Sequence, residues 1–140
     1  ASMLALDARW LNEVGLSPSV FKGWIGLAGP YDFLPIENTD VRPVFFFPDS
    51  PPDSQPINHV SRAAPPTLLI AATDDTLVNP TRNTCGLAEK LRAAGVYVEV
   101  FYFGKTSHQT LVASFAKPLR WLAPVLDTVT AFTRLKPRAD

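Results

Sequence analysis

The chain has 140 residues, enough for one domain with a buried core, and its composition is that of a globular protein. Basic and acidic residues are equal in number, 13 of each, and are scattered along the chain, which argues against a surface for nucleic acid. The longest apolar stretches, near residues 24–29 and 68–72, are too short to span a membrane. The single cysteine, Cys85, gives neither an internal disulfide nor a metal site. We therefore expect a cytoplasmic protein without metal or cofactor.

The first predicted elements are a helix over residues 1–14 and a strand over residues 21–29. Apolar residues recur at three-to-four spacing through the helix, and Gly15 ends this pattern. Because the chain opens without an initiator Met, we expect the helix to begin before Ala1 and the chain to be cut there. The strand is short, apolar on both faces and closed by a Gly-Pro pair, which is typical of a parallel strand covered by helices on both sides.

A long loop excursion is predicted between this strand and the next. Residues 30–66 are rich in Pro and Asp, and the three phenylalanines at 45–47 stand among turn signals, so regular structure should be short and broken. Residues 67–73 are apolar throughout and end in Asp74 and Asp75, which predicts a second buried strand with acidic residues at its carboxyl end.

The remainder of the chain predicts helix, strand and helix. An amphipathic helix follows Pro80 and is closed by Gly95. Residues 96–103 are rich in β-branched and aromatic residues and predict a third strand. Residues 111–134 have a helical pattern, in which two prolines predict a kink or a late start.

This order of elements predicts a doubly wound α/β sheet with parallel strands and flanking helices. About three strands, apolar on both faces, would leave a long unpaired edge. We therefore expect residues 1–140 to be the C-terminal portion of a larger, mainly parallel sheet whose other strands lie upstream. An exposed edge of this kind also predicts self-association.

Two candidate catalytic residues follow neighbouring predicted strands. Asp75 comes after the second strand and His108 after the third, and reactive groups in open α/β sheets collect at this edge. A carboxylate bonded to one imidazole nitrogen fixes the tautomer and leaves the other nitrogen to take a proton from a hydroxyl nucleophile. The pair predicts the acid and the base of a catalytic triad whose serine would precede Ala1.

Several blocks closely resemble the carboxylesterase-like α/β hydrolases, including the feruloyl-esterase-like and arylformamidase-like members, and together they extend over nearly the whole chain. They are residues 6–11, 26–33, 56–60, 74–78 and 107–108. In that family the blocks follow a Gly-His-Ser-Ala-Gly-Ala nucleophile elbow, and an earlier His-Gly motif supplies oxyanion donors. Neither motif occurs in this sequence.

By this resemblance Asp75 is the triad acid, three places before the Val of an Asp-x-x-Val motif, and His108 is the base. Ala71 and Ala72 stand where His-Gly usually precedes the acid, a departure that removes no catalytic group. The resemblance implies a serine hydrolase of small carboxylic esters, or of aryl formamides. Because the nucleophile is missing, we expect the chain alone to be inactive.

Other polar and aromatic residues are interpreted mainly as structural. Asp74 is expected to face solvent or cap a helix, and His59 precedes the second strand, which violates the family's order of acid and base. Cys85 is expected to be a small apolar filler on a helix. The phenylalanines at 45–47 could line an acyl or aromatic pocket or pack beneath the loop, and the same alternatives hold for the two residues after Pro30, Tyr31 and Asp32.

Two other functional classes are consistent with parts of the sequence. A truncated or degenerate hydrolase could act as a non-catalytic binding or structural module, pairing its exposed sheet edge with another chain, and it would need no serine. A Mg²⁺ site at Asp74 and Asp75 in a receiver-like domain is disfavoured, because the second acidic strand end and the lysine of such a site are missing.

Overall fold

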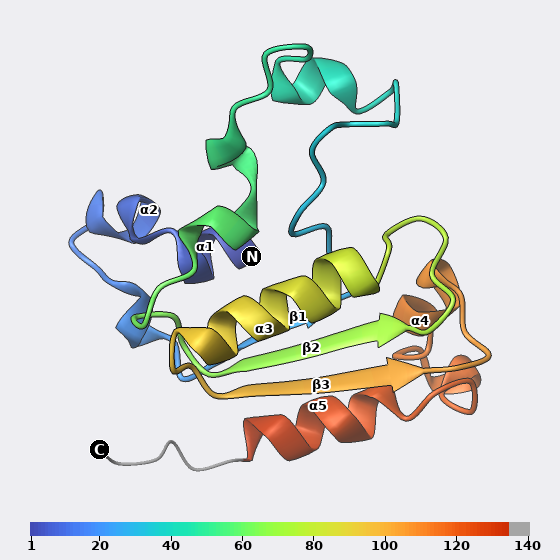
Figure 1. Ribbon diagram of the computed structural model, residues 1–140. Helices are drawn as coiled ribbons and strands as arrows, with labels where there is room; N and C mark the ends of the chain where they lie inside the picture. Colours follow the sequence, from blue (N-terminus) through green and yellow to red (C-terminus); the bar gives the residue numbers. More distant parts are fainter. Residues whose placement is uncertain (135–140) are drawn as a thin grey trace.

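The computed structural model describes residues 1–134 and contains one parallel sheet (Figure 1). Its strands are β1 (Trp24–Leu27), β2 (Thr67–Ala72) and β3 (Val98–Phe103), in the spatial order β1-β2-β3. The parallel register places Ile70 of β2 between Leu27 and Phe101 of its two neighbours. The carboxyl ends of all three strands therefore meet at one edge of the sheet.

The central strand β2 is buried along its whole length and forms the core of the molecule. On one face Leu69 packs against α3 (Gly86–Ala93), and on the other face Leu68 and Ile70 pack against α5 (Val125–Thr133). Figure 1 shows these two helices on opposite sides of the sheet. The predicted α/β class, with parallel strands covered by helices on both faces, is confirmed.

The N-terminal helix predicted over residues 1–14 is two short helices, α1 (Ser2–Leu6) and α2 (Ala8–Asn12). They are separated by Asp7, whose backbone is extended and whose side chain accepts a hydrogen bond from the N–H of Arg9. Short acidic side chains compete with the helix for backbone donors in this way, so Asp7 ends one helix and caps the next. Gly15, with a φ of +72°, closes the segment as predicted.

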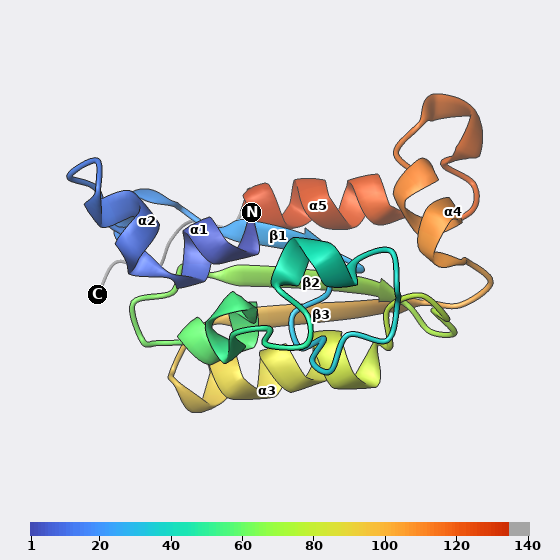
Figure 2. The ribbon, with the colours of Figure 1, turned by 90° about the horizontal axis from the view of Figure 1, so that it is seen from above.

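The segment between β1 and β2 contains only short turns of 3₁₀-helix. They are η2 (Arg42–Phe45), η3 (Pro52–Ser54) and η4 (Pro56–His59), and a further turn of this kind, η1 (Pro18–Val20), lies before β1. Figure 1 shows the excursion rising from the face of the sheet that α3 covers, and Figure 2 shows it from above. A proline stands at the first or second position of each of these turns, and prolines also limit extended pairing because they lack an N–H group.

After β3 the chain forms α4 (His108–Ala113), the short turn η6 (Lys117–Leu119) and then α5, where a helix was predicted over residues 111–134. Each of the two prolines begins a new turn: Pro118 lies in the first turn of η6, and Pro124 directly precedes α5. The late start that the prolines predicted is therefore observed at Pro124.

Candidate active site

Asp75 lies at the carboxyl edge of the sheet, three residues beyond the end of β2. Its carboxylate is completely buried, and Oδ1 accepts hydrogen bonds from the backbone N–H groups of Leu77 and Val78, each at 2.9 Å. A short acidic side chain that bonds to the backbone two and three residues ahead builds its own turn. This turn leaves the second oxygen, Oδ2, directed towards the end of β3.

His108 is the first residue of α4, and its position is fixed by the start of that helix. Ser107 and Thr110 form a reciprocal capping box, in which each side chain accepts from the backbone N–H of the other residue. Nδ1 of His108 lies 2.8 Å from Oδ2 of Asp75. The structure thus brings together the two residues that the sequence placed at neighbouring strand ends, although 33 positions separate them.

The tautomer of His108 follows from this contact. An ionised carboxylate only accepts hydrogen bonds, so Nδ1 carries the proton and donates it to Asp75. The other nitrogen, Nε2, makes no hydrogen bond within residues 1–134, and the ring is partly exposed. An imidazole held in this way presents an unprotonated nitrogen to a group outside the pair.

The environment of Asp75 favours its charged form. Burial acts to raise the pKa of this carboxyl group, but the N–H of Val78, the ring of His108 and the N–H of Leu77 all lower it. The net result is a pKa below the ordinary value of 3.8. Asp75 is therefore ionised at neutral pH and able to stabilise a positive charge on His108.

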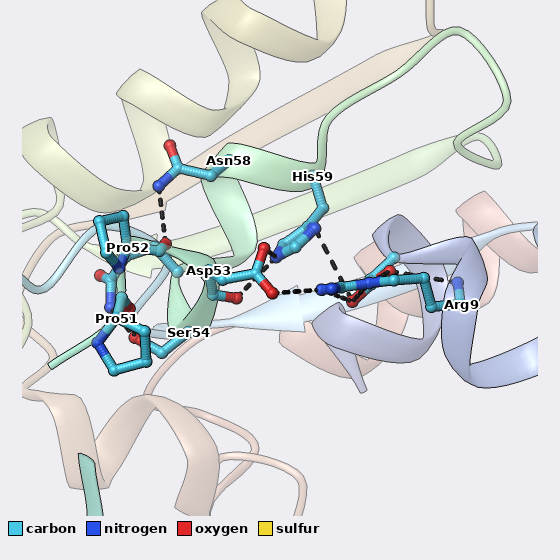
Figure 3. Close-up of polar contacts among 9 residues, drawn as sticks. Arg9, Pro51, Pro52, Asp53, Ser54, Asn58 and His59 are labelled. Atoms are coloured by element: carbon cyan, nitrogen blue, oxygen red, sulfur yellow. Dashed lines mark hydrogen bonds and ion pairs between the residues drawn. The ribbon is translucent and has the colours of Figure 1, made fainter. Parts of the chain in front are cut away.

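The other histidine, His59, lies elsewhere (Figure 3). Its Nε2 is 2.7 Å from the backbone oxygen of Asp53, and its Nδ1 is 3.7 Å from Oδ2 of Asp7. Arg9 bridges the carboxylates of Asp7 and Asp53, and its hydrogen bonds hold the pKa of Asp7 below the ordinary value. His59 thus belongs to a polar network that joins the α1–α2 junction to the excursion, as its structural interpretation requires.

The surroundings of three other candidate residues, Asp74, Cys85 and Tyr31, are consistent with structural roles. Asp74 is exposed and faces solvent, while Cys85 is half-buried beside Glu89, which raises the pKa of its thiol. Tyr31 is buried with its ring edge-on to that of Trp24, and burial raises the pKa of its phenol. Its hydroxyl occupies the space that a Cβ at position 26 would need, which explains the glycine there.

The three phenylalanines of the excursion have different surroundings. Phe45 packs edge-on against Phe33, with ring centroids 4.9 Å apart, whereas Phe46 is largely exposed. Phe47 lies beneath the guanidinium of Arg42 and lines a cavity of about 350 Å³. The other lining residues are Leu34, Pro35, Ile36, Pro48 and Ser50. Packing therefore applies to Phe45, whereas an acyl or aromatic pocket lined by Phe47 stays a prediction.

Three polar residues that hold the segment after β1 were not predicted by any sequence pattern. Asn83 and Gln55 accept hydrogen bonds from backbone N–H groups of residues 31–33, and Arg82 forms an ion pair with Asp32 at 3.0 Å. Asn83 and Gln55 are buried amides, a feature that becomes visible only once the fold brings distant segments together.

The described part of the chain contains neither a metal-binding cluster nor a membrane-spanning helix. Within residues 1–134, no cluster of three His, Cys, Asp or Glu side chains is arranged to hold a metal ion. Among the helices of the same residues, none has the length and apolar character needed to cross a membrane.

Solved structures with a similar backbone are esterases. The butyrate-bound esterase Est2 of Thermogutta terrifontis matches with a TM-score of 0.57 over 99% of this chain and 54% of its own, at 16% identity. The acetyl ester-xyloside bifunctional hydrolase of Caldicellulosiruptor lactoaceticus matches with a TM-score of 0.53 over 82% of this chain and 44% of its own, at 20% identity. The chain has the α/β-hydrolase fold.

The α/β-hydrolase fold is only partly represented in these 140 residues. A further match, Thermogutta terrifontis esterase 2 phosphoramylated by tabun, has a TM-score of 0.55 and 17% identity over 87% of this chain and 46% of its own. The chain therefore spans about half the length of the solved structures it matches. No family model and no curated protein sequence matches it.

Proposed function

We propose that this chain supplies the acid and the base of a serine hydrolase that cleaves small carboxylic esters. The observation that carries the proposal is the 2.8 Å contact between Oδ2 of Asp75 and Nδ1 of His108 at the carboxyl edge of the sheet. In this function Asp75 orients the imidazole and stabilises its charged form, and His108 transfers protons. The serine would come from residues outside the 140, in the position that the resemblance to carboxylesterase-like hydrolases implies.

The reaction follows from the free nitrogen of His108. Nε2 takes the proton from the serine hydroxyl as its oxygen attacks the ester carbonyl carbon, and then gives that proton to the departing alcohol. The acyl-enzyme is hydrolysed when Nε2 deprotonates a water molecule that attacks the same carbon, and Nε2 then gives this proton to the departing serine oxygen, which releases the carboxylic acid. Backbone amides outside this chain would stabilise the oxyanion in both steps.

The names of the similar structures support short acyl groups as substrates. One of those esterases was solved with butyrate, and another is a hydrolase of acetyl esters. The same acyl-transfer steps would cleave an aryl formamide, because a formyl group is the smallest acyl group and the acid–base pair acts identically on an amine leaving group.

The proposal is tested by expressing the chain both as it is and preceded by the residues encoded upstream of it. Hydrolysis of p-nitrophenyl acetate is followed for both proteins at equal concentration. We expect turnover in the longer protein and none above background in the 140-residue chain. Absence of turnover in the longer protein, with a serine elbow present and the protein folded, would refute the proposal.

A second candidate is a non-catalytic binding module that retains the hydrolase fold. It is favoured by one observation, that Nε2 of His108 has no hydroxyl partner within residues 1–134. The upstream reading frame separates the two functions: an in-frame Gly-x-Ser-x-Gly motif supports the enzyme, and a stop codon supports the module.

A further inference from the structure

The segment that leaves β1 is held by two buried side-chain amides. Oδ1 of Asn83 accepts from the backbone N–H groups of Tyr31 at 2.6 Å and Asp32 at 2.8 Å. Oε1 of Gln55 accepts from the N–H of Phe33 at 2.6 Å. Three consecutive backbone donors thus depend on side chains that are 5% and 2% exposed.

Only one of these two amides is also connected to the turn that carries Asp75. Nδ2 of Asn83 donates to the carbonyl of Asn79 at 3.2 Å, and the backbone N–H of Asn83 donates to the same carbonyl at 3.0 Å. Asn79 directly follows Val78, whose N–H holds Oδ1 of Asp75. A single buried amide therefore joins the exit of β1 to the turn that aims the carboxylate at His108. Gln55 bonds instead to its own neighbour in the excursion, Ser54.

The atoms of Asn83 are suited to this connection. Its oxygen faces two donors and its nitrogen faces one acceptor, so all three contacts use the amide in one orientation. Truncating the side chain would leave two N–H groups without an acceptor, and an unsatisfied buried donor is costly. Arg82, the preceding residue, supports the same segment from outside through its ion pair with Asp32.

We propose that Asn83 is a positioning residue for the Asp75–His108 pair. It fixes the turn at residues 76–79 against the segment that leaves β1, and this keeps Oδ2 of Asp75 in line with Nδ1 of His108. The inference rests on the proposed function for its catalytic meaning, but the connection itself is a property of the folded chain. The connection can therefore be tested without measuring catalytic turnover.

The test uses NMR on the 140-residue chain with Asn83→Ala and the matched variant Gln55→Ala. In Asn83→Ala we expect amide exchange at Tyr31 and Asp32 to accelerate by about tenfold or more, and the Nδ1 proton of His108 to exchange several times faster with water. In Gln55→Ala we expect faster exchange at Phe33 with the His108 proton unchanged. If both variants disturb the His108 proton equally, or neither does, the proposal is overturned.

A second variant keeps the test decisive if Asn83→Ala fails to fold. In Asn83→Asp the carboxylate still accepts from Tyr31 and Asp32, but its second oxygen now faces the Asn79 carbonyl as an acceptor, and that carbonyl keeps only the hydrogen bond from the backbone N–H of residue 83. We expect protection at residues 31–32 to persist while the Nδ1 proton of His108 exchanges several times faster. An unchanged His108 proton would overturn the proposal. Because no activity is measured, failure here is distinct from failure of the hydrolase function.

Discussion

At the scale of single residues, Asp75 combines three contacts that act on different parts of one carboxylate. Two backbone N–H groups fix Oδ1, and this leaves Oδ2 for His108. The neighbouring Asp74 has the same chemistry but is exposed to solvent. Asp75 was preferred to Asp74 from the sequence, and in the structure it is the Asp75 carboxylate that is buried against the imidazole.

Replacing Asp75 should therefore affect catalysis far more than replacing its neighbour. In the protein that includes the upstream residues, Asp75→Asn should lower kcat/KM for p-nitrophenyl acetate by about 10³- to 10⁴-fold, because the amide no longer fixes the tautomer of His108 or stabilises its charge. Asp74→Asn is the matched control and should retain nearly full activity. Equal losses in the two variants would show that the acid was assigned wrongly.

The lowered pKa of Asp75 predicts how its contribution to stability depends on pH. A carboxyl group whose pKa is lower in the folded state stabilises the fold above its unfolded value, near 3.8, and this stabilisation is lost as the pH falls through the folded pKa. The free energy of unfolding of the wild type should thus exceed that of Asp75→Asn at pH 6, and the difference should shrink below about pH 4. Urea unfolding of both proteins across this range measures it. A difference that grows with acidity would contradict the assigned direction.

At the scale of elements, the molecule depends on β2, which is buried on both faces between α3 and α5. Its continuous apolar run made it predictable, because only a strand covered on both sides has no polar face. The break at Asp7 was not predictable from periodicity. The apolar spacing continues across it, and a second partner of Arg9, the carboxylate of Asp53, is 44 positions away.

Substitutions in β2 should be correspondingly costly. Leu69 is fully buried against α3, so Leu69→Ala should lower the free energy of unfolding by about 2–5 kcal/mol through lost burial and a residual cavity. Leu77 is 64% exposed, and Leu77→Ala is the control, with an expected change within about 0.5 kcal/mol. Urea denaturation followed by circular dichroism compares the two. A small effect at Leu69 would mean that the core lies elsewhere.

At the scale of the whole molecule, the sheet formed by residues 1–134 ends on each side in a strand with one unpaired edge. Within residues 1–134 both β1 and β3 have β2 as their only neighbour, and the matched esterases are about twice as long. The hydrogen-bonding groups along such edges are a template for pairing with another chain. This is the physical reason to propose that the isolated chain self-associates.

Self-association should depend on the edge and not on exposed apolar residues in general. Phe101 lies on the edge strand β3 and is 40% exposed, so Phe101→Lys should shift the chain towards monomer. Trp121 is 79% exposed but lies outside the sheet, so Trp121→Lys should leave association unchanged. Sedimentation velocity over a range of concentrations distinguishes these outcomes. A monomeric wild type at all concentrations would contradict the proposal.

The whole molecule also shows which parts of the candidate site a sequence can predict. Asp75 and His108 were predictable because each follows a strand, and parallel strands deliver their carboxyl ends to one edge. Asn83 was not, because its partners Tyr31 and Asp32 are 52 and 51 positions away and lie in an irregular segment. The residues beside Asn83 in the sequence do not indicate which distant backbone groups its side-chain amide will contact.

The chain contains two histidines, so the assignment of His108 as the catalytic base can be tested with His59 as the control. In the protein that includes the upstream residues, the rate of p-nitrophenyl acetate hydrolysis is measured for His108→Ala and for His59→Ala. The assignment of His108 as the base predicts a loss of roughly 10⁴- to 10⁶-fold in the first variant, because the serine loses its proton acceptor, and little change in kcat in the folded second variant. Undiminished hydrolysis by His108→Ala would contradict it.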